Sequence, residues 1–234
     1  MKLPEHITII MDGNGRWARQ RGKERLIGHN AGADSVRACC EYAVEKGIRY
    51  LSLFAFSEEN WNRPESEIQG LMALMIKSIV EEEPVFLKNN IRFRVIGDME
   101  RLSQELLDRI GECERNTEHC TGLTLIIFLS YSGKWDLCRT MNILMEKYRG
   151  TDHVITPEDI ASNLSTAGIP DPDLMIRTSG EQRISNYMLW QCAYTEFYFT
   201  DVLWPDFRKA DLERAIESYS TRERRFGKTG EQIK

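Results

Sequence analysis

The chain has 234 residues, 41% of them hydrophobic, which suits one large α/β domain better than two independent domains. Its 31 basic and 36 acidic residues give a formal net charge of −5, which argues against a general nucleic-acid-binding surface. The six cysteines form no CxxC pair, so we expect neither a zinc site nor a disulfide framework.

The first residues also argue against export. Met1 to Glu5 is too short and too polar for a signal peptide, and no apolar run approaches the length that crosses a membrane. We therefore expect a soluble protein of the reducing cytoplasm.

The first expected strand, His6 to Met11, ends in a loop that is built for an anion and a cation. In an open α/β sheet such a strand delivers its carboxyl end to the crevice where ligands bind. Gly13 and Gly15 let backbone N–H groups approach an anion closely. Asp12 can hold a cation, and Arg16 can pair with a phosphate oxygen.

A hairpin turn is the alternative interpretation of this loop, because Asp-Gly is a strong hairpin signal. No second alternating strand comes after it, however. The loop is succeeded by a basic stretch that leads into a helix, namely Arg19, Arg21, Lys23, Arg25 and His29.

The next elements complete a βαβ unit. Apolar residues at helical spacing predict a helix over Asn30–Lys46, with Gly47 just past its end. Tyr50 to Phe56 is a nearly continuous apolar run, as expected for a strand of a parallel sheet covered on both faces.

The second strand also ends in polar residues, from Ser57 to Pro64. If the two strands are neighbours, these residues lie beside the Asp12 loop. Asn60 offers both a donor and an acceptor there, and Arg63 offers a second guanidinium.

Ser66 to Gln69 matches a capping box, which predicts a helix from Ser66 to about Val80. Its broad apolar face includes Met72 and Met75, and Ala73 lies among them. Core packing is the simpler explanation of this face, and the wall of an apolar ligand channel is the other. Pro84 is expected to kink or break the helix, with Val85 to Lys88 continuing it.

The rest of the chain continues the α/β pattern without repeats or linkers. The expected elements are a strand at Ile91–Ile96 that could lie at an edge, helices at Ser103–Thr117 and Trp135–Tyr148, a buried strand at Thr124–Leu129, a short helix from Thr156-Pro157 to about Leu164, strands at Leu174–Ile176 and Glu196–Phe199, a helix from Leu212 to about Arg224, and a loose tail at Gly227–Lys234. We therefore predict a single domain over residues 1–234, with a mostly parallel central sheet flanked by helices.

Two further strands end in polar loops, Ser130–Lys134 and Arg177–Asn186. The second loop combines arginines, hydroxyls and a glycine, as an anion pocket would. The chain has no GxxxxGK[ST] or GxGxxG motif, which argues against nucleotide use. Arginines, bare amides and carboxylates suit two polyanionic groups and Mg²⁺, so these residues predict a Mg²⁺-dependent enzyme that acts on phosphate esters.

Eight motifs resemble the cis-prenyltransferase family and run in that family's order over nearly the whole chain. They lie at Met11–Ala18 (MDGNGRWA), Gly28-His29, Phe56–Arg63, Tyr131–Gly133, Arg177–Asn186, Trp190–Glu196, Thr200–Pro205 and Arg222–Gly227. The resemblance implies a parallel-sheet homodimer with an apolar tunnel between sheet and helices. It also implies repeated condensation of isopentenyl diphosphate onto farnesyl diphosphate.

The expected product is a long-chain polyprenyl diphosphate, namely the undecaprenyl diphosphate that precedes the lipid carrier of cell-wall synthesis. It would be delivered to the membrane, so the protein could associate peripherally with the inner membrane face.

The resemblance also implies roles for individual residues. Asp12 and Asn60 would be catalytic, and Asp12 and Glu196 would serve Mg²⁺. The allylic diphosphate would be held by Gly13, Asn14, Gly15, Arg16, Arg25 and His29, and the isopentenyl diphosphate by Arg177, Arg183 and Ser185. Further substrate-binding residues would be Trp17, Ser57, Trp61, Arg63 and Arg225, the last reaching into the partner subunit's site.

Two positions depart from the family pattern. Gln182 stands where family members often carry a histidine associated with the metal site, and Lys134 replaces a usual arginine. Lys134 supplies a point charge in place of a planar fork.

Two other functions remain as alternatives. One is a non-catalytic partner subunit of a cis-prenyltransferase, although this chain keeps Asp12, Asn60 and Arg63. The other is an unrelated Mg²⁺-dependent phosphohydrolase, which would release phosphate from its substrate.

Overall fold

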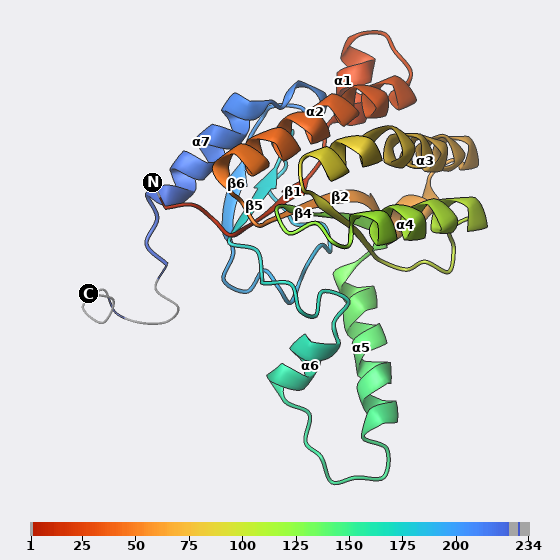
Figure 1. The fold of residues 1–234 in the computed structure, drawn as a ribbon, viewed down its shortest axis with the longest axis vertical. Coiled ribbons are helices and arrows are strands. Elements are labelled where there is room, and N and C mark those ends of the chain that lie inside the picture. The colour runs from red at the N-terminus through yellow and green to blue at the C-terminus, as the bar shows by residue number, and fades with distance from the viewer. Residues whose placement is uncertain (1, 225–228, 230–234) are drawn as a thin grey trace.

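A parallel sheet forms the centre of the computed structural model, which describes residues 2–224 and 229 (Figure 1). Within these residues the sheet has six strands in the order β3-β4-β2-β1-β5-β6, and all neighbouring strands pair in parallel. The strands are β1 (His6–Ile10), β2 (Tyr50–Ser57), β3 (Arg92–Ile96), β4 (Thr124–Tyr131), β5 (Leu174–Arg177) and β6 (Glu196–Phe199). The predicted α/β domain is confirmed, and β3 lies at an edge as its alternating arginines suggested.

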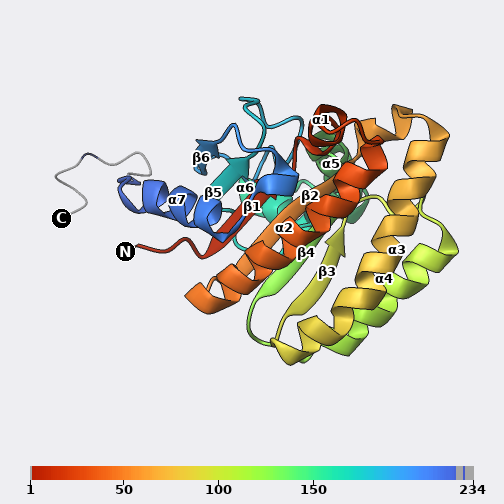
Figure 2. The ribbon, with the colours of Figure 1, turned by 90° about the horizontal axis from the view of Figure 1, so that it is seen from above.

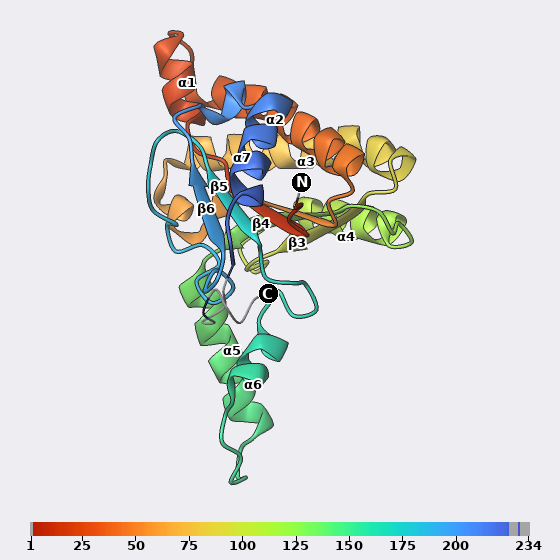
Figure 3. The same ribbon diagram turned by 90° about the vertical axis from the view of Figure 1, so that its left-hand side faces the viewer.

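Helices cover the two faces of the sheet unequally. One face carries α2 (Arg25–Lys46), α3 (Glu65–Lys88), α4 (Gln104–Thr117) and α7 (Lys209–Ser220), which lie across the strands in Figure 2. On the other face, α5 (Gly133–Lys147) and α6 (Pro157–Asn163) extend away from the sheet, as Figures 1 and 3 show. No helix in the described part of the chain is long and apolar enough to span a bilayer.

The central strands divide their side chains between two apolar cores. On β4, Leu125, Ile127 and Leu129 face the helix-covered side, whereas Ile126 and Phe128 pack with Tyr187 on the other side. Strands buried on both faces need apolar residues at successive positions, which explains their nearly continuous apolar sequences.

One helix was not predicted, and another begins earlier than expected. Residues Asn14–Gln20 form α1, and α2 begins at Arg25 instead of Asn30. The two helices approach closely at Gly28, where a β-carbon would overlap the carbonyl oxygen of Asn14. Because the two helices pack through a glycine, the sequence here has no apolar periodicity that would indicate α1 or the start of α2.

The start and course of α3 also differ from the prediction. The helix begins at Glu65 after Pro64, and Ser66 makes no capping box there. Ser57 makes one instead, reciprocally with Asn60, at the 3₁₀ helix η1 (Glu58–Asn62). Pro84 does not end α3, which continues through it to Lys88.

The remaining boundaries lie close to expectation. Ser103 and Thr156 cap α4 and α6 as predicted, whereas Ser132 caps α5 at Gly133, two residues before the predicted start. The last helix, α7, covers Lys209–Ser220 instead of Leu212–Arg224, after the short 3₁₀ helix η2 (Trp204–Asp206). Arg225 and, apart from Thr229, the expected tail lie outside the described residues.

Candidate active site

The polar residues predicted at the strand ends meet at one edge of the sheet. Ile10 pairs with Phe54 of β2 on one side and with Arg177 of β5 on the other. Because parallel strands share their carboxyl edge, the loops after β1, β2 and β5 converge there. The structure therefore brings Asp12, Asn60 and Arg177 to one place, as the sequence indicated.

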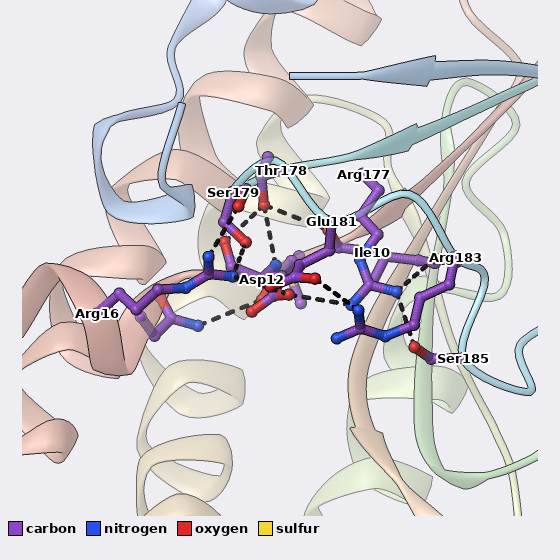
Figure 4. A network of polar contacts seen from close by, with 11 residues as sticks. Ile10, Asp12, Arg16, Arg177, Thr178, Ser179, Glu181, Arg183 and Ser185 are labelled. Atoms are coloured by element: carbon purple, nitrogen blue, oxygen red, sulfur yellow. Dashed lines mark hydrogen bonds and ion pairs between the residues drawn. The ribbon is translucent and has the colours of Figure 1, made fainter. Parts of the chain in front are cut away.

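Asp12 is the acid at the centre of this edge (Figure 4). Its Oδ2 accepts a hydrogen bond from Arg177 Nη2 at 3.0 Å and another from Arg16 Nη2 at 3.3 Å. Burial disfavours its charged form, but the hydrogen bond and charge of Arg177, with the charge of Arg16, hold the pKa of Asp12 below its usual value. Asp12 is therefore a carboxylate at neutral pH.

Arg177 is the buried cation of the site, with 5% of its side chain exposed. Its Nη1 donates to Ser185 Oγ at 2.7 Å and also to the carbonyl oxygen of Arg183. Its Nε is buried and has no hydrogen-bond partner. A buried N–H group without an acceptor costs free energy. We therefore expect a ligand oxygen to accept a hydrogen bond from Arg177 Nε.

The loop after β5 is held against the Asp12 loop by hydrogen bonds between a side chain of one loop and the backbone of the other. The Thr178 hydroxyl donates to Asp12 O at 2.6 Å and accepts from Asp12 N at 2.9 Å. Ser179 and Ser185 adopt left-handed backbone angles, with φ of 75° and 50°. Non-glycine residues in this region cost free energy, and such strain clusters at functional sites.

Gly13 is required where these loops meet. Its φ is 109°, and an added β-carbon would lie 3.0 Å from Leu203 Cδ2 and 3.1 Å from Ser179 Cβ. It precedes α1, whose first internal hydrogen bond runs from Trp17 N to Gly13 O at 2.9 Å. The N–H groups of Asn14, Gly15 and Arg16 come before that bond, and the first N–H groups of a helix have no partner inside it.

Glu181 bridges two arginines at the solvent side of the site. It lies 3.3 Å from Arg16 Nη2 and 2.5 Å from Arg183 Nη1. Arg183 is exposed, so its guanidinium is available to a ligand that displaces this carboxylate.

A second basic group lies at the amino ends of α2 and α3. Glu67 Oε1 is 3.0 Å from Arg63 Nη1 and 3.3 Å from Arg25 Nη2, and thereby joins the two arginines. Burial, with the nearby charges of Arg63 and Arg25, lowers the pKa of His29 to about 4, and its Nε2 is buried without a partner. Asn14 Oδ1 is also buried and unpartnered. The guanidinium groups of Arg25 and Arg63 can bind an anion here, whereas Asn14 Oδ1 can only accept hydrogen bonds.

A cavity of about 450 Å³ runs from these polar groups into the space between the sheet, α2 and α3. Its polar end includes Asp12, Asn14, His29, Ser57, Asn60, Arg63, Arg177 and Ser185. Its other walls are mainly apolar and include Leu71, Met72, Met75, Ile79, Phe86, Phe93, Leu125, Ile127 and Leu129. The helix suggested as a channel wall therefore lines the cavity together with β4, but Ala73 is exposed on the other side of α3 and does not.

A second cavity, also about 450 Å³, opens on the basic side of the Asp12 loop. It is lined by Asp12, Gly13, Gly15, Arg16, Arg19, Lys23 and Arg25. Its lining matches the basic stretch that comes after the first strand in the sequence.

Four residues named from the sequence lie elsewhere. Trp17 Nε1 donates to Asp206 at 2.7 Å and Trp61 Nε1 to Ser130 at 2.9 Å, and neither indole lines the two cavities. Gln182 and Lys134 are exposed.

Glu196 is also separated from Asp12 within one chain. It begins β6 and pairs with Leu174, three residues before the level of Ile10, which is about 10 Å along the strands. Its carboxylate accepts from Arg222 Nη1 at 2.9 Å.

Glu67 is the functional candidate that the sequence interpretation missed. The sequence pattern places it in a capping box, although its spacing four residues after Arg63 is that of a helical ion pair. That spacing was the available signal.

The residues at Asp12 suit a hard cation that is held partly by the protein and partly by a phosphate ligand. The described residues contain no group of three or more histidine, cysteine or acidic side chains that could hold a metal. Mg²⁺ is commonly held by one or two carboxylates and by substrate phosphates. The ionised Asp12 beside two anion-binding groups suits that arrangement.

Comparisons with known proteins show which family the chain resembles. The prenyltransferase family model described as undecaprenyl diphosphate synthase matches residues 10–227. An isoprenyl transferase of Porphyromonas gingivalis is 51% identical, covering 99% of this chain and 92% of its own. A ditrans,polycis-undecaprenyl-diphosphate synthase of Coxiella burnetii, named as specific for (2E,6E)-farnesyl diphosphate, is 48% identical and covers 99% of both chains.

Solved structures share the fold. Lavandulyl diphosphate synthase from Lavandula x intermedia, in complex with dimethylallyl diphosphate, superposes with a TM-score of 0.92 at 35% identity, covering 97% of this chain and 99% of its own. A probable undecaprenyl diphosphate synthase from Campylobacter jejuni gives 0.82 at 34% identity, covering 97% of this chain and all of its own.

Proposed function

The chain belongs to the undecaprenyl diphosphate synthase family of prenyltransferases, and we propose that it joins isopentenyl diphosphate units to farnesyl diphosphate with Mg²⁺ held at Asp12. The observation that carries this proposal is one continuous cavity with His29, Arg63 and Arg177 at one end and mainly apolar walls along the rest. A substrate with a diphosphate head and a hydrocarbon tail has the same division. A phosphohydrolase would have no use for the long apolar part.

The two diphosphates occupy the two basic groups in this proposal. The first N–H groups of α1, with Arg16, Arg25 and His29, hold the allylic diphosphate, and its hydrocarbon tail enters the apolar cavity. Arg177, Arg183 and Ser185 hold the isopentenyl diphosphate on the other side of Asp12. Asn60 and Arg63, at the polar end of the cavity, lie near the atoms that react in this proposal.

The reaction breaks the allylic C–O bond and forms a carbon–carbon bond to isopentenyl diphosphate, which then loses a proton. Negative charge develops on the departing diphosphate, and fixed arginines and N–H groups stabilise it without having to reorganise. Arg177 orients the second substrate, because its guanidinium is itself held by Asp12, Ser185 and Arg183. Mg²⁺, when bound, would add positive charge at the phosphate oxygens.

Glu196 can share this ion only if it comes from a second chain, since it lies at the other end of the strands from Asp12. We propose a homodimer on this ground. The exposed apolar residues Met145 and Val154, on and just beyond α5, support an interface there. Light scattering of the wild type and of Met145→Glu tests it, with a dimer and a monomer as the expected results. Delivery of the product to a membrane stays a prediction.

A single assay separates the three candidate functions. The protein is incubated with farnesyl diphosphate, radiolabelled isopentenyl diphosphate and Mg²⁺. Labelled lipid that extracts into butanol supports the synthase, and free phosphate would support the hydrolase. The absence of both would support a non-catalytic partner subunit. Omitting Mg²⁺ tests the metal requirement, and full activity in EDTA would contradict it.

Binding of the allylic diphosphate is expected to take up a proton at His29. The imidazole is neutral in the free protein because its pKa is about 4, and an anion beside it favours the charged form. Affinity for inorganic pyrophosphate should therefore rise as the pH falls from about 7 towards 5, beyond the change due to pyrophosphate itself. Calorimetry in two buffers with different ionisation enthalpies measures this uptake.

His29→Gln should lose that uptake while Arg25 and Arg63 still bind. His6 is the matched control, since burial also lowers its pKa to about 4 but it lies at the amino end of β1. Equal proton uptake in wild type and His29→Gln would remove His29 from the binding site.

A further inference from the structure

The cavity between the sheet, α2 and α3 is lined on one side by residues of both helices. Its lining includes Ala33, Val36 and Cys40 of α2 and Leu74, Ser78 and Glu82 of α3, and we call these residues the α2–α3 seam. In Figure 2 the two helices lie close together at their amino ends and diverge across the same face of the sheet. Ala33, Cys40 and Ser78 have small side chains that do not fill the space between the diverging helices. This space is therefore part of the cavity.

The cavity reaches the surface along this seam. Its lining also contains Arg37, Glu41 and Glu81, and all three are exposed. They are far along α2 and α3 from the polar groups at Asp12. The apolar part of the cavity is therefore separated from solvent here by a few charged side chains.

One interhelical ion pair crosses the seam at this point. Arg37 Nε donates to Glu82 Oε2 at 3.4 Å, and its Nη2 donates to Glu82 Oε1. Arg37 is 46% exposed and Glu82 19%, so the pair lies at the boundary between cavity and solvent. Asp34 is the other acid that pairs with Arg37, at 3.6 Å, and it belongs to α2 itself.

We propose that the Arg37–Glu82 ion pair is a latch on the α2–α3 seam, and that the hydrocarbon chain of the product leaves the cavity through this seam. The inference rests on the proposed function, because it assumes that a polyprenyl chain fills the apolar part of the cavity. It adds an exit route and two residues that control how long a growing chain is retained.

A lateral exit is physically easier than a return through the polar end. A long hydrocarbon chain that left past Asp12, Arg63 and Arg177 would have to pass between charged groups that bind the diphosphate. Separation of two helices releases the chain along its whole length. The latch holds the seam weakly, because a partly exposed ion pair contributes only about 0.2–1 kcal/mol.

Cys40 reports on the seam without any substrate. It lines the cavity beside the latch, is 5% exposed, and its pKa is raised to about 12 by burial and by the charges of Glu82 and Glu41. A closed seam therefore keeps this thiol unreactive. An open seam admits both water and a maleimide to it.

The test reverses the charge of each residue of the ion pair, first separately and then in both residues together. Arg37→Glu and Glu82→Arg each place like charges across the seam, and the double variant restores opposite charges. The matched control is Lys209→Glu, which reverses another surface ion pair of α2, with Glu45, on the side that faces α7. Circular dichroism first establishes that each variant is folded.

In the empty protein, each single reversal should raise the rate of Cys40 modification by about tenfold, since attraction is replaced by repulsion of similar size. Peptide mass spectrometry distinguishes Cys40 from the exposed Cys138. The double variant should return most of the way to the wild-type rate, and Lys209→Glu should not differ from wild type.

In the presence of substrates, the single reversals should release shorter chains, because unfinished products escape before they reach full length. Unchanged Cys40 reactivity in both single reversals would overturn the latch. Faster Cys40 modification with an unchanged product distribution would overturn the exit route. Failure of the wild type to make any lipid would overturn the proposed function instead, while the Cys40 result would stand.

Discussion

Replacing Asp12 by asparagine is expected to lower kcat by about a hundred- to a thousandfold, the usual loss when one preorganised charge-stabilising group is removed. The variant keeps the size of the side chain but loses the charge that would hold Mg²⁺ and that pairs with Arg177 at 3.0 Å. Affinity for farnesyl diphosphate should fall much less, because the loop N–H groups, Arg25 and His29 carry that binding. Steady-state kinetics and direct binding measurements separate the two effects.

Glu181→Gln is the matched control for this change. It removes one carboxylate charge from the same network, beside Arg16 and Arg183, but at the solvent side of the site. Its effect on kcat should be far smaller. Thermal unfolding must accompany both variants, since loss of the charge opposite a guanidinium with 5% exposure also destabilises the fold. A near-normal kcat for Asp12→Asn would remove Asp12 from the mechanism.

Replacing Ser78 by leucine is expected to move the product distribution towards shorter chains. A polyprenyl chain has no polar group beyond its diphosphate, so the protein can limit its length only through the available space. Ser78 lines the apolar part of the cavity, and leucine there would occupy volume that the chain tip needs. Chromatography of the dephosphorylated lipids measures the distribution.

Ala73→Leu is the matched control, because Ala73 is on the exposed side of the same helix and does not line the cavity. It should leave the distribution unchanged. Leu125→Ala should have the reverse effect to Ser78→Leu by adding room, at a cost of about 2–5 kcal/mol in stability. If none of these cavity variants changes chain length while activity persists, α3 does not set the length.

The parallel strands and the convergence of Asp12, Asn60 and Arg177 could be predicted from simple patterns. Apolar runs that end in polar residues predict parallel strands, and parallel strands place those residues at one edge. The sequence could not show which side chains from distant parts of the chain lie next to one another. Its local pattern therefore gives Glu67 only an intervening position in the predicted capping box, although this residue joins Arg25 and Arg63.

Two other features were hidden for different reasons. The α1 helix and the start of α2 pack through Gly28, and glycine packing leaves no apolar periodicity to detect. Glu196 was grouped with Asp12 by resemblance alone, although the predicted strands already place Glu196 at the amino end of one strand and Asp12 after the carboxyl end of another. Helical periodicity identifies the apolar face of α3, but it does not show which residues of the helix line the cavity. It therefore could not show that Ala73 is exposed.

The position of β1 has a consequence for synthesis of the chain on the ribosome. This first strand lies in the interior of the sheet, between β2 and β5, so one of its edges has no partner until residues 174–177 have been made. At translation rates of about 5–20 residues per second, the 164 residues from Ile10 to Leu174 take roughly 8–33 seconds. During that time an apolar strand with an open edge is exposed to other nascent chains. Binding of a chaperone to residues 6–11 of a ribosome-bound fragment, released once Arg177 has emerged, would be the corresponding observation.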